Sequence, residues 1–484
     1  MKKWTSLLPL LFLFLWFSSS YAIDNCPKLT GQILTKNNTD YNQSRLDSNY
    51  YTSKNKFPDV IVYCKTAQDV QNAIQYARCK KLPVRARSGG HNHLSYSTGT
   101  GVVLIDVSRM KKIIVNKDKQ IAVVEPGMTG GELYRRLYAD GFTQAGGTCS
   151  GVGISGLILS GGMGPLARKQ GMACDSLLSI DVVDAKGQLL HATKDNAYKD
   201  LFWASCGGGG NNFGIVTSIQ LKVYPADKVT WFNLGWDWNQ PVEQIISLWQ
   251  TFFLNDDKRW YSHLDLWAKT FPAQKFHQQP IKVIGIFWGT PEEAKRELTP
   301  FLKLGHPVTQ IIEAANWQKA ILELEDAVKV YTTSKPEYKS SGAFVMQNFP
   351  PQAIHDLASR LNNATSPFLN VVFFSLGGAT NEHATNDTAY FYRRAKSFAV
   401  YSTQWLKTAD ATKYIHEIDS LRVNLLPYTQ GDYIGNQDSE IKDYLTAYYG
   451  NNVHQLRCIK RKYDPTNLFH FEQGIPPAPA DWRC

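Results

Sequence analysis

Three glycine-rich stretches constrain the fold of this chain more than any other feature. They are RSGGHNHLSYSTG at 87–99, GGTCSGVGISG at 146–156 and CGGGGNNFG at 206–214. Glycine permits positive φ and lets the backbone approach a ligand closely, and successive backbone N–H groups form a concavity that binds anions. Three such stretches in one chain predict loops that wrap around one large phosphorylated ligand.

A doubly wound dinucleotide-binding fold is the competing interpretation, because GVGISG at 151–156 matches the pattern G-x-G-x-x-G. That pattern has to open a helix, yet Gly161, Gly162 and Gly164 follow within a few residues. Each glycine costs a helix roughly 1 kcal/mol relative to alanine, so a poor helix is expected here. No glycine run is followed by the lysine of a P-loop either.

Periodicity predicts strands that alternate with helices from about residue 58. A helix is expected after Thr66 as its N-cap and another over 130–138, with strands at 60–63, 84–87, 102–105, 121–124, 177–183 and 215–223. From about 229 to 405 the chain is rich in Trp and Phe, with buried strands expected at 281–288 and 369–376.

A chain of 484 residues is too long for one compact core, so we expect two domains. The composition shifts place a cofactor-binding domain at 23–228 and an inserted substrate-binding domain at 229–440. The segment 441–484 is expected to return to the first domain.

The N-terminus has the pattern of a secretory signal peptide over 1–22. Lys2 and Lys3 precede an apolar segment at 7–17, and Ser20-Tyr21-Ala22 fits a small-x-small cleavage site. The apolar segment is shorter than the roughly 20 residues that a membrane span needs. We therefore expect a secreted protein (extracellular or periplasmic) with no membrane span.

The charge pattern gives no nucleic-acid partner. The formal net charge is +10, but the basic residues are scattered. One tight basic cluster is expected to be a solvated helix face, and it comprises Arg457, Lys460, Arg461 and Lys462.

No two of the eight cysteines have CxxC spacing, so no zinc or thioredoxin motif is present and no metal site is expected. In an oxidising compartment some should pair, and Cys26–Cys79 and Cys458–Cys484 are our hypotheses. Spacing alone leaves the connectivity open.

Four motifs in the same order resemble one flavoprotein family. RARSGGHNHLSYSTGTGVVLIDVSRM at 85–110 resembles the first FAD loop of the vanillyl-alcohol oxidase/p-cresol methylhydroxylase (PCMH-type) superfamily. GTCSGVGISGLILSGGMG, DLFWASCGGGGNNFGIVTS and YDPTNLFHFEQGIPP are similar to its berberine-bridge-enzyme-like branch. The resemblance implies an α+β fold, in which a two-part PCMH-type FAD-binding domain carries an inserted antiparallel sheet covered by helices.

The resemblance also implies that FAD is bound covalently at two points. His91 stands where the branch bonds histidine to the flavin 8α-methyl carbon, and Cys149 stands where bicovalent members bond cysteine to flavin C6. Either residue alone could be structural. Because both occur in the matching loops, attachment of the flavin to both is favoured. His93 is interpreted as a polar loop residue and Cys174 as part of the scaffold. The other expected FAD contacts are Arg87, Ser88, Gly89, Gly90, Asn92, Ser97, Gly147, Thr148, Val152, Gly153, Gly156, Leu157, Gly214 and Val216.

The sequence departs from the branch at two positions. Leu157 replaces a histidine that many plant members carry. In GDYIGNQD at 431–438, Asn436 replaces the aromatic residue that serves as the base, and asparagine cannot accept a proton in that role. The remaining candidates for the base are Tyr433, Tyr428 and Asp438, and Arg393 matches a motif arginine.

The leading functional hypothesis is an oxidase that acts on an alcohol, a carbohydrate or oligosaccharide hydroxyl above all, with O2 reduced to H2O2. Val152, where the branch controls oxygen access, favours an oxidase. The alternatives are an FAD-dependent dehydrogenase acting on an alcohol or alkaloid-like amine, and a non-catalytic secreted carbohydrate-binding protein. A monomer is expected.

Overall fold

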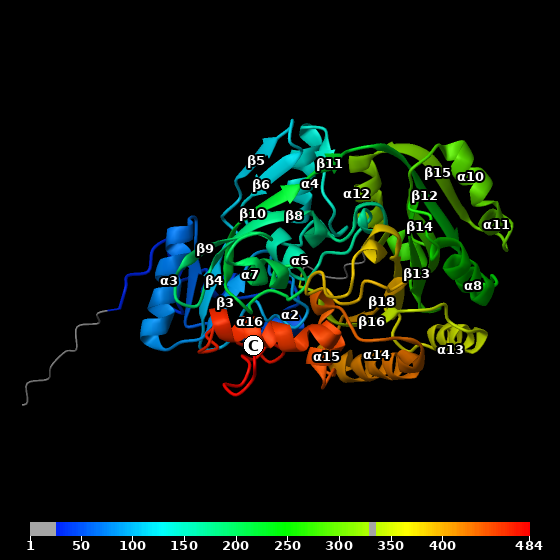
Figure 1. Ribbon diagram of the computed structural model, residues 1–484. Helices are drawn as coiled ribbons and strands as arrows, with labels where there is room; N and C mark the ends of the chain where they lie inside the picture. The colour runs from blue at the N-terminus through cyan, green and yellow to red at the C-terminus, as the bar shows by residue number, and fades with distance from the viewer. Residues whose placement is uncertain (1–25, 329–334) are drawn as a thin grey trace, which may run out of the picture.

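The computed structural model describes residues 26–328 and 335–484, so the predicted signal peptide lies outside the described residues. The α+β class is confirmed, because helices are combined with sheets that are mostly antiparallel. Figure 1 shows the N-terminal elements, blue to cyan, on one side and a large sheet with its covering helices on the other. The red C-terminal helix α16 lies beside the N-terminal elements.

Two sheets form the N-terminal part. In the first, of order β1-β2-β4-β3, β4 is parallel to both of its neighbours; its strands are β1 (Gln32–Leu34), β2 (Val60–Tyr63), β3 (Val84–Arg87) and β4 (Val103–Asp106). The second is antiparallel, of order β5-β6-β10-β8-β9, with strands β5 (Ile113–Asn116), β6 (Ile121–Val124), β8 (Leu177–Val183), β9 (Leu189–Ala192) and β10 (Ile215–Lys222). A short pair joins β7 (Phe142–Thr143) to β11 (Tyr224–Pro225). The predicted strands are confirmed to within a residue.

Helix α3 (Ala67–Lys80) begins where the sequence predicts, with the Thr66 side chain and Asp69 forming a reciprocal capping box. Its apolar face, including Val70 and Ile74, packs in one buried cluster with residues of both N-terminal sheets. The helix therefore holds the two sheets together beneath the glycine-rich loops.

The large sheet has seven antiparallel strands in the order β15-β12-β14-β13-β17-β18-β16. The strands are β12 (Lys228–Trp236), β13 (Trp260–Trp267), β14 (Ile281–Phe287), β15 (Thr309–Asn316), β16 (Glu337–Val345), β17 (Asn370–Ser375) and β18 (Ser397–Trp405).

The two faces of this sheet bury different residues because side chains alternate along a strand. Phe232 and Leu234 belong to a cluster under α8 (Val242–Phe253), α13 (Pro351–Asn362) and α14 (Ala411–Leu425). Trp231 points the other way, into a cluster with α12 (Trp317–Val328) and α4 (Gly130–Ala139). The second face is thus the one that meets the N-terminal part.

The remaining helices are short, except for α16. They are α1 (Tyr41–Ser44), α2 (Tyr50–Ser53), α5 (Ile154–Leu159), α6 (Ala167–Gln170), α7 (Lys199–Ala204), α9 (Ala273–Phe276), α10 (Pro291–Glu297), α11 (Thr299–Leu302), α15 (Tyr444–Tyr449) and α16 (Val453–Tyr463). Among the described residues, no helix combines the length and apolar character that crossing a bilayer requires.

A buried arginine ties the N-terminal part to the large sheet. The Arg168 guanidinium donates to the carbonyls of Trp260 (2.7 Å), Asn255 (2.7 Å) and Asp257 (2.9 Å), and also to that of Leu376. Its side chain is fully buried. One forked donor therefore binds four carbonyls at this junction.

The expectation that the basic cluster of 457–462 is a solvated helix face is wrong for Lys460. This side chain is fully buried, and its Nζ donates to Asp464 Oδ2 (2.7 Å), Asn212 O (2.7 Å) and Phe469 O (2.6 Å). The Lys460 ammonium on α16 thereby points into the loop formed by the third glycine-rich stretch. The contact holds the C-terminal segment against that loop.

Both predicted disulfides, Cys26–Cys79 and Cys458–Cys484, are confirmed. A third, which the sequence did not indicate, joins Cys174 to Cys206. Beside it Asp175 accepts two hydrogen bonds from the buried Arg393, at 2.7 and 2.8 Å.

Candidate active site

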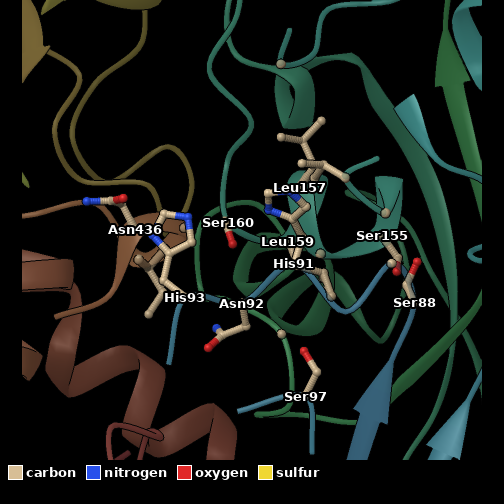
Figure 2. Close-up of a pocket in the computed structure, with 18 of the residues that line it drawn as sticks. Ser88, His91, Asn92, His93, Ser97, Ser155, Leu157, Leu159, Ser160 and Asn436 are labelled. Carbon is tan, nitrogen blue, oxygen red and sulfur yellow. The ribbon is translucent and has the colours of Figure 1, made fainter. Parts of the chain in front are cut away.

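A cavity of about 330 Å³ lies where the three glycine-rich stretches meet the large sheet. Every residue expected to contact FAD lines it: Arg87, Ser88, Gly89, Gly90, His91, Asn92, Ser97, Gly147, Thr148, Cys149, Val152, Gly153, Gly156, Leu157, Gly214 and Val216. Figure 2 shows several of these residues gathered around it, His91 and Leu157 on one side and Asn92 and Ser97 on another. Segments distant in sequence therefore form one continuous wall.

The first loop starts at the end of β3, where Arg87 is held by buried carboxylates. Its Nε lies 2.6 Å from Asp106 Oδ2, and its Nη1 lies 3.7 Å from Asp47 Oδ1. Gly90 has φ +63° and lies directly over Asp47. A residue with a side chain is strained at that φ, so glycine is what lets the chain turn into His91.

The first and second loops touch backbone to backbone. A Cβ added to Gly89 would lie 2.4 Å from the backbone nitrogen of Gly153, and one added to Gly153 would collide with Ser88. Since any side chain would separate the loops, these two glycines set the width of the cavity on this side.

The expectation of a poor helix after 151 is wrong in part, because α5 forms directly after Gly153. It is only six residues long and ends at Leu159, with Ser160 as its C-cap before Gly161 (φ +113°) and Gly162 (φ +81°). The helix turns Gly156 and Leu157 toward the cavity, which both residues line.

The third loop is fastened to β3, directly before the first loop, by Asn211. Its side chain accepts from the backbone N–H of Ala86 and donates to the carbonyl of Ala86 at 3.1 Å. Asn211 itself has φ +61°, a conformation that asparagine tolerates. Gly214 and Val216 follow on the same side of the cavity.

His91 and Cys149 line this one cavity from two different loops. Burial lowers the pKa of His91, so its ring is neutral and keeps a nucleophilic nitrogen at physiological pH. Cys149 takes part in none of the three disulfides. Both side chains are thus chemically suited to form bonds to a ligand here.

Of the three candidates for the base, only Tyr433 lines the cavity. Its hydroxyl accepts from the Gly162 N–H at 2.9 Å, and burial raises its pKa to about 12. Asp438 is fully buried and lies 3.0 Å from Lys339 Nζ, while Tyr428 packs beside Phe349. Neither belongs to the cavity lining, and Arg393 does not either.

One wall of the cavity comes from the large sheet, and no sequence motif predicted it. Its residues are Tyr261, Phe374, Phe398 and Val400. These residues occupy ordinary strand positions, and alternation predicts only that they share a face. His93, expected to be a plain loop residue, also lines the cavity, as do Asn436 and Gln437.

The lining is poor in charge. Among the described residues that form it, Arg87 is the single Asp, Glu, Lys or Arg, and Arg87 is already ion-paired. No carboxylate therefore faces the ligand space, and acid–base chemistry here falls to histidine or tyrosine.

Two family models match the chain. One, described as "FAD binding domain", matches residues 58–193, and the other, "Berberine and berberine like", matches 432–476. The FAD-linked oxidoreductase YgaK of Bacillus subtilis (strain 168), itself uncharacterized, is 37% identical, and the alignment covers 93% of this chain and 98% of that protein. A carbohydrate oxidase of Microdochium nivale is 29% identical over 87% of this chain and 88% of its own.

Solved structures agree on the fold. BBE-like 1 of Physcomitrella patens superimposes with a TM-score of 0.84 at 25% identity, covering 93% of this chain and 97% of that one. The fold and the glycine-lined cavity define an FAD-dependent oxidoreductase of the PCMH type. The chain belongs to the berberine-bridge-enzyme-like family of FAD-linked oxidoreductases.

The residues present fit FAD. Gly156 and Gly210 both line the cavity, yet a Cβ added at either would meet no protein atom closer than 4.0 Å. Packing within the protein therefore does not require glycine there, whereas close approach of a ligand to the backbone does.

Proposed function

We propose that this protein is a secreted oxidase that carries FAD bonded to both His91 and Cys149. Its substrate is an alcohol, with a carbohydrate or oligosaccharide hydroxyl as the leading class, and O2 is reduced to H2O2. One observation carries the proposal: the two residues able to form covalent bonds to a flavin line the same cavity from separate loops.

FAD, when bound, supplies hydride acceptance and the later reduction of oxygen. The protein holds it with the three loops and excludes water with the apolar residues of the large sheet. Substrate enters from the side of that sheet, in the domain that we place at 229–440. The domain at 23–228 holds the cofactor, together with the segment 441–484 that returns to it.

The carbohydrate class is supported by the relative from Microdochium nivale, which is named for that activity. An oxidase is favoured over a dehydrogenase because Val152 lines the cavity close in sequence to Cys149, and valine leaves room for a molecule as small as oxygen. The protein acts as a monomer in this proposal.

Secretion is supported by the three disulfides, since disulfides persist in oxidising compartments. The predicted signal peptide at 1–22 would direct the chain to secretion, and its removal would start the mature chain near Ile23.

The test compares turnover in air with reduction under nitrogen, using D-glucose, cellobiose and N,N′-diacetylchitobiose as probes. An oxidase bleaches its flavin under nitrogen and releases one H2O2 per sugar oxidised in air. Bleaching without peroxide in air would replace the proposal with a dehydrogenase. A flavin that none of the sugars bleaches, although dithionite does, would refute the proposed substrate class.

A further inference from the structure

The reaction needs a group that accepts the hydroxyl proton, and none of the described residues that line the cavity is a carboxylate. The titratable residues that line the cavity are Arg87, His91, His93, Tyr96, Cys149, Tyr261 and Tyr433. His91 and Cys149 are occupied by the flavin in the proposed function, on which this inference rests. Arg87 is held in its ion pair with Asp106.

The three tyrosines are poor proton acceptors. Burial raises the pKa of each above the ordinary value for a phenol, so each keeps its own proton. Tyr261 is also engaged, because its hydroxyl shares a hydrogen bond of 2.5 Å with His263 Nε2. The Tyr433 oxygen accepts from the Gly162 N–H, which favours the phenolate, but the effect of burial outweighs this contact. Elimination leaves His93.

His93 is fixed in place at the cavity wall. Its backbone carbonyl accepts from Asn49 Nδ2 (2.9 Å) and Thr52 Oγ1 (3.0 Å), and its ring meets Tyr338 edge-on at 5.5 Å. Its Nδ1 is buried and, within the described residues, has no hydrogen-bond partner. Because a buried atom is closed to a ligand in the cavity, the substrate's proton has to reach the ring through Nε2, the other nitrogen.

Asn436 is the neighbour that completes the arrangement. Figure 2 shows its side chain beside the His93 ring, and both residues line the cavity. Its Oδ1 accepts from Ser340 Oγ at 2.8 Å and has a second lone pair that can accept from a protonated ring, whereas its Nδ2 can only donate. The oxygen of this amide is therefore the atom that can favour an imidazolium at this wall.

Burial lowers the pKa of His93 to about 3, with a smaller contribution from His91, and the amide of Asn436 opposes this shift. The ring is therefore neutral throughout the physiological range and keeps a lone pair. The same amide favours the cation once a proton arrives.

We propose that His93 is the catalytic residue that accepts the substrate's hydroxyl proton, and that Asn436 is a positioning residue that stabilises the resulting imidazolium. The carbon–hydrogen bond breaks and the hydride leaves with both electrons to the bound FAD. The O–H bond breaks, its electron pair forms the second bond of C=O, and the proton goes to a ring nitrogen of His93. When O2 accepts the two electrons, this proton and the one that arrived as hydride complete H2O2.

A weak base suffices for this step. As the hydride departs, the hydroxyl becomes that of a protonated carbonyl, which is strongly acidic. The assignment also accounts for Asn436: asparagine cannot take the proton itself, but it can hold the residue that does.

The experiment follows flavin bleaching by cellobiose, D-glucose and N,N′-diacetylchitobiose under nitrogen in the holoprotein. It compares wild type with His93→Ala, His93→Gln and the matched control His355→Ala, an exposed histidine on α13. We expect bleaching to slow at least about 100-fold in both His93 variants and not in the control. Added imidazole should raise the bleaching rate of His93→Ala at least about tenfold, because imidazole then supplies the base in trans.

Two further readouts separate a base from a structural role. Absorbance titration with D-glucono-1,5-lactone should give nearly the wild-type Kd in His93→Gln. In Asn436→Ala, bleaching at neutral pH should slow at least about tenfold with nearly the wild-type Kd for the lactone, since the amide that favours the imidazolium is lost.

Bleaching in His93→Ala within about threefold of wild type, or a loss that imidazole never rescues, would overturn the assignment. So would His93 variants that carry no flavin, because the residue would then serve cofactor assembly. If the wild type itself is bleached by dithionite but by no sugar, the proposed function fails first and the assignment falls with it.

Discussion

The buried ammonium of Lys460 gives a quantitative test of how the C-terminal segment is joined to the FAD-binding loops. Lys460→Met keeps most of the side-chain volume and removes three hydrogen bonds, to Asp464, Asn212 and Phe469. Asp464 is fully buried and would keep a charge without its cation. Breaking a buried pair by removing one partner costs about 3–5 kcal/mol.

Other contacts reduce the free-energy cost of Lys460→Met only slightly. Asp464 still accepts from the N–H groups of Leu468 (2.8 Å) and Phe469 (2.9 Å), but within residues 26–328 and 335–484 the carbonyl of Asn212 has no second donor. The entropy of unfolding is about 2 cal/mol/K per residue. If the whole chain unfolds as one unit, a loss of about 3–5 kcal/mol should therefore lower its melting temperature by about 3–5 °C.

The assay is thermal unfolding of Lys460→Met, Lys460→Met/Asp464→Asn and wild type, followed by tryptophan fluorescence. The double variant should recover part of the loss because it removes the unpaired charge. The exposed neighbour Arg461→Met is the matched control. A single variant that melts within about 1 °C of wild type would refute the reasoning, because the buried pair would then contribute nothing.

Three other predictions follow from particular contacts. Arg168→Met should destabilise the protein by at least about 3 kcal/mol in denaturant unfolding, since four carbonyls lose their donor; a loss below about 1 kcal/mol would contradict this. Burial raises the pKa of Asp47 from 3.8 to about 7, so its contribution to stability is present below about pH 4 and lost as the pH rises toward 7. The melting temperature of Asp47→Asn should therefore depend less on pH between about 4 and 7 than that of wild type. An unchanged pH dependence of the melting temperature would count against this. Val152→Leu should slow reoxidation by O2 about tenfold while leaving reduction by sugar unchanged, as stopped-flow absorbance would report; equal reoxidation rates would exclude Val152 as the oxygen path.

The cofactor loops could be predicted from the sequence because their chemistry is local. Each loop carries its glycines and its His91 or Cys149 within a few residues, and the backbone conformation that they need follows from residue type. The strands and the capped start of α3 follow equally from short-range pattern.

The rest depends on which segments meet in space. Tyr261, Phe374 and Phe398 lie far apart in the chain, and alternation says that they share a face without saying what that face covers. Lys460 belongs to a basic run, and only the phase of α16 against the third loop makes it the buried member. Helix α5 forms despite its unfavourable composition because it needs only six residues before the glycines end it.

Intact mass under denaturing conditions tests the central claim most directly. Wild type, His91→Ala and Cys149→Ala should each retain the added mass of one FAD after acid precipitation, and the double variant should retain none. Added mass that disappears on denaturing the wild type, or that persists in the double variant, would contradict attachment through His91 and Cys149.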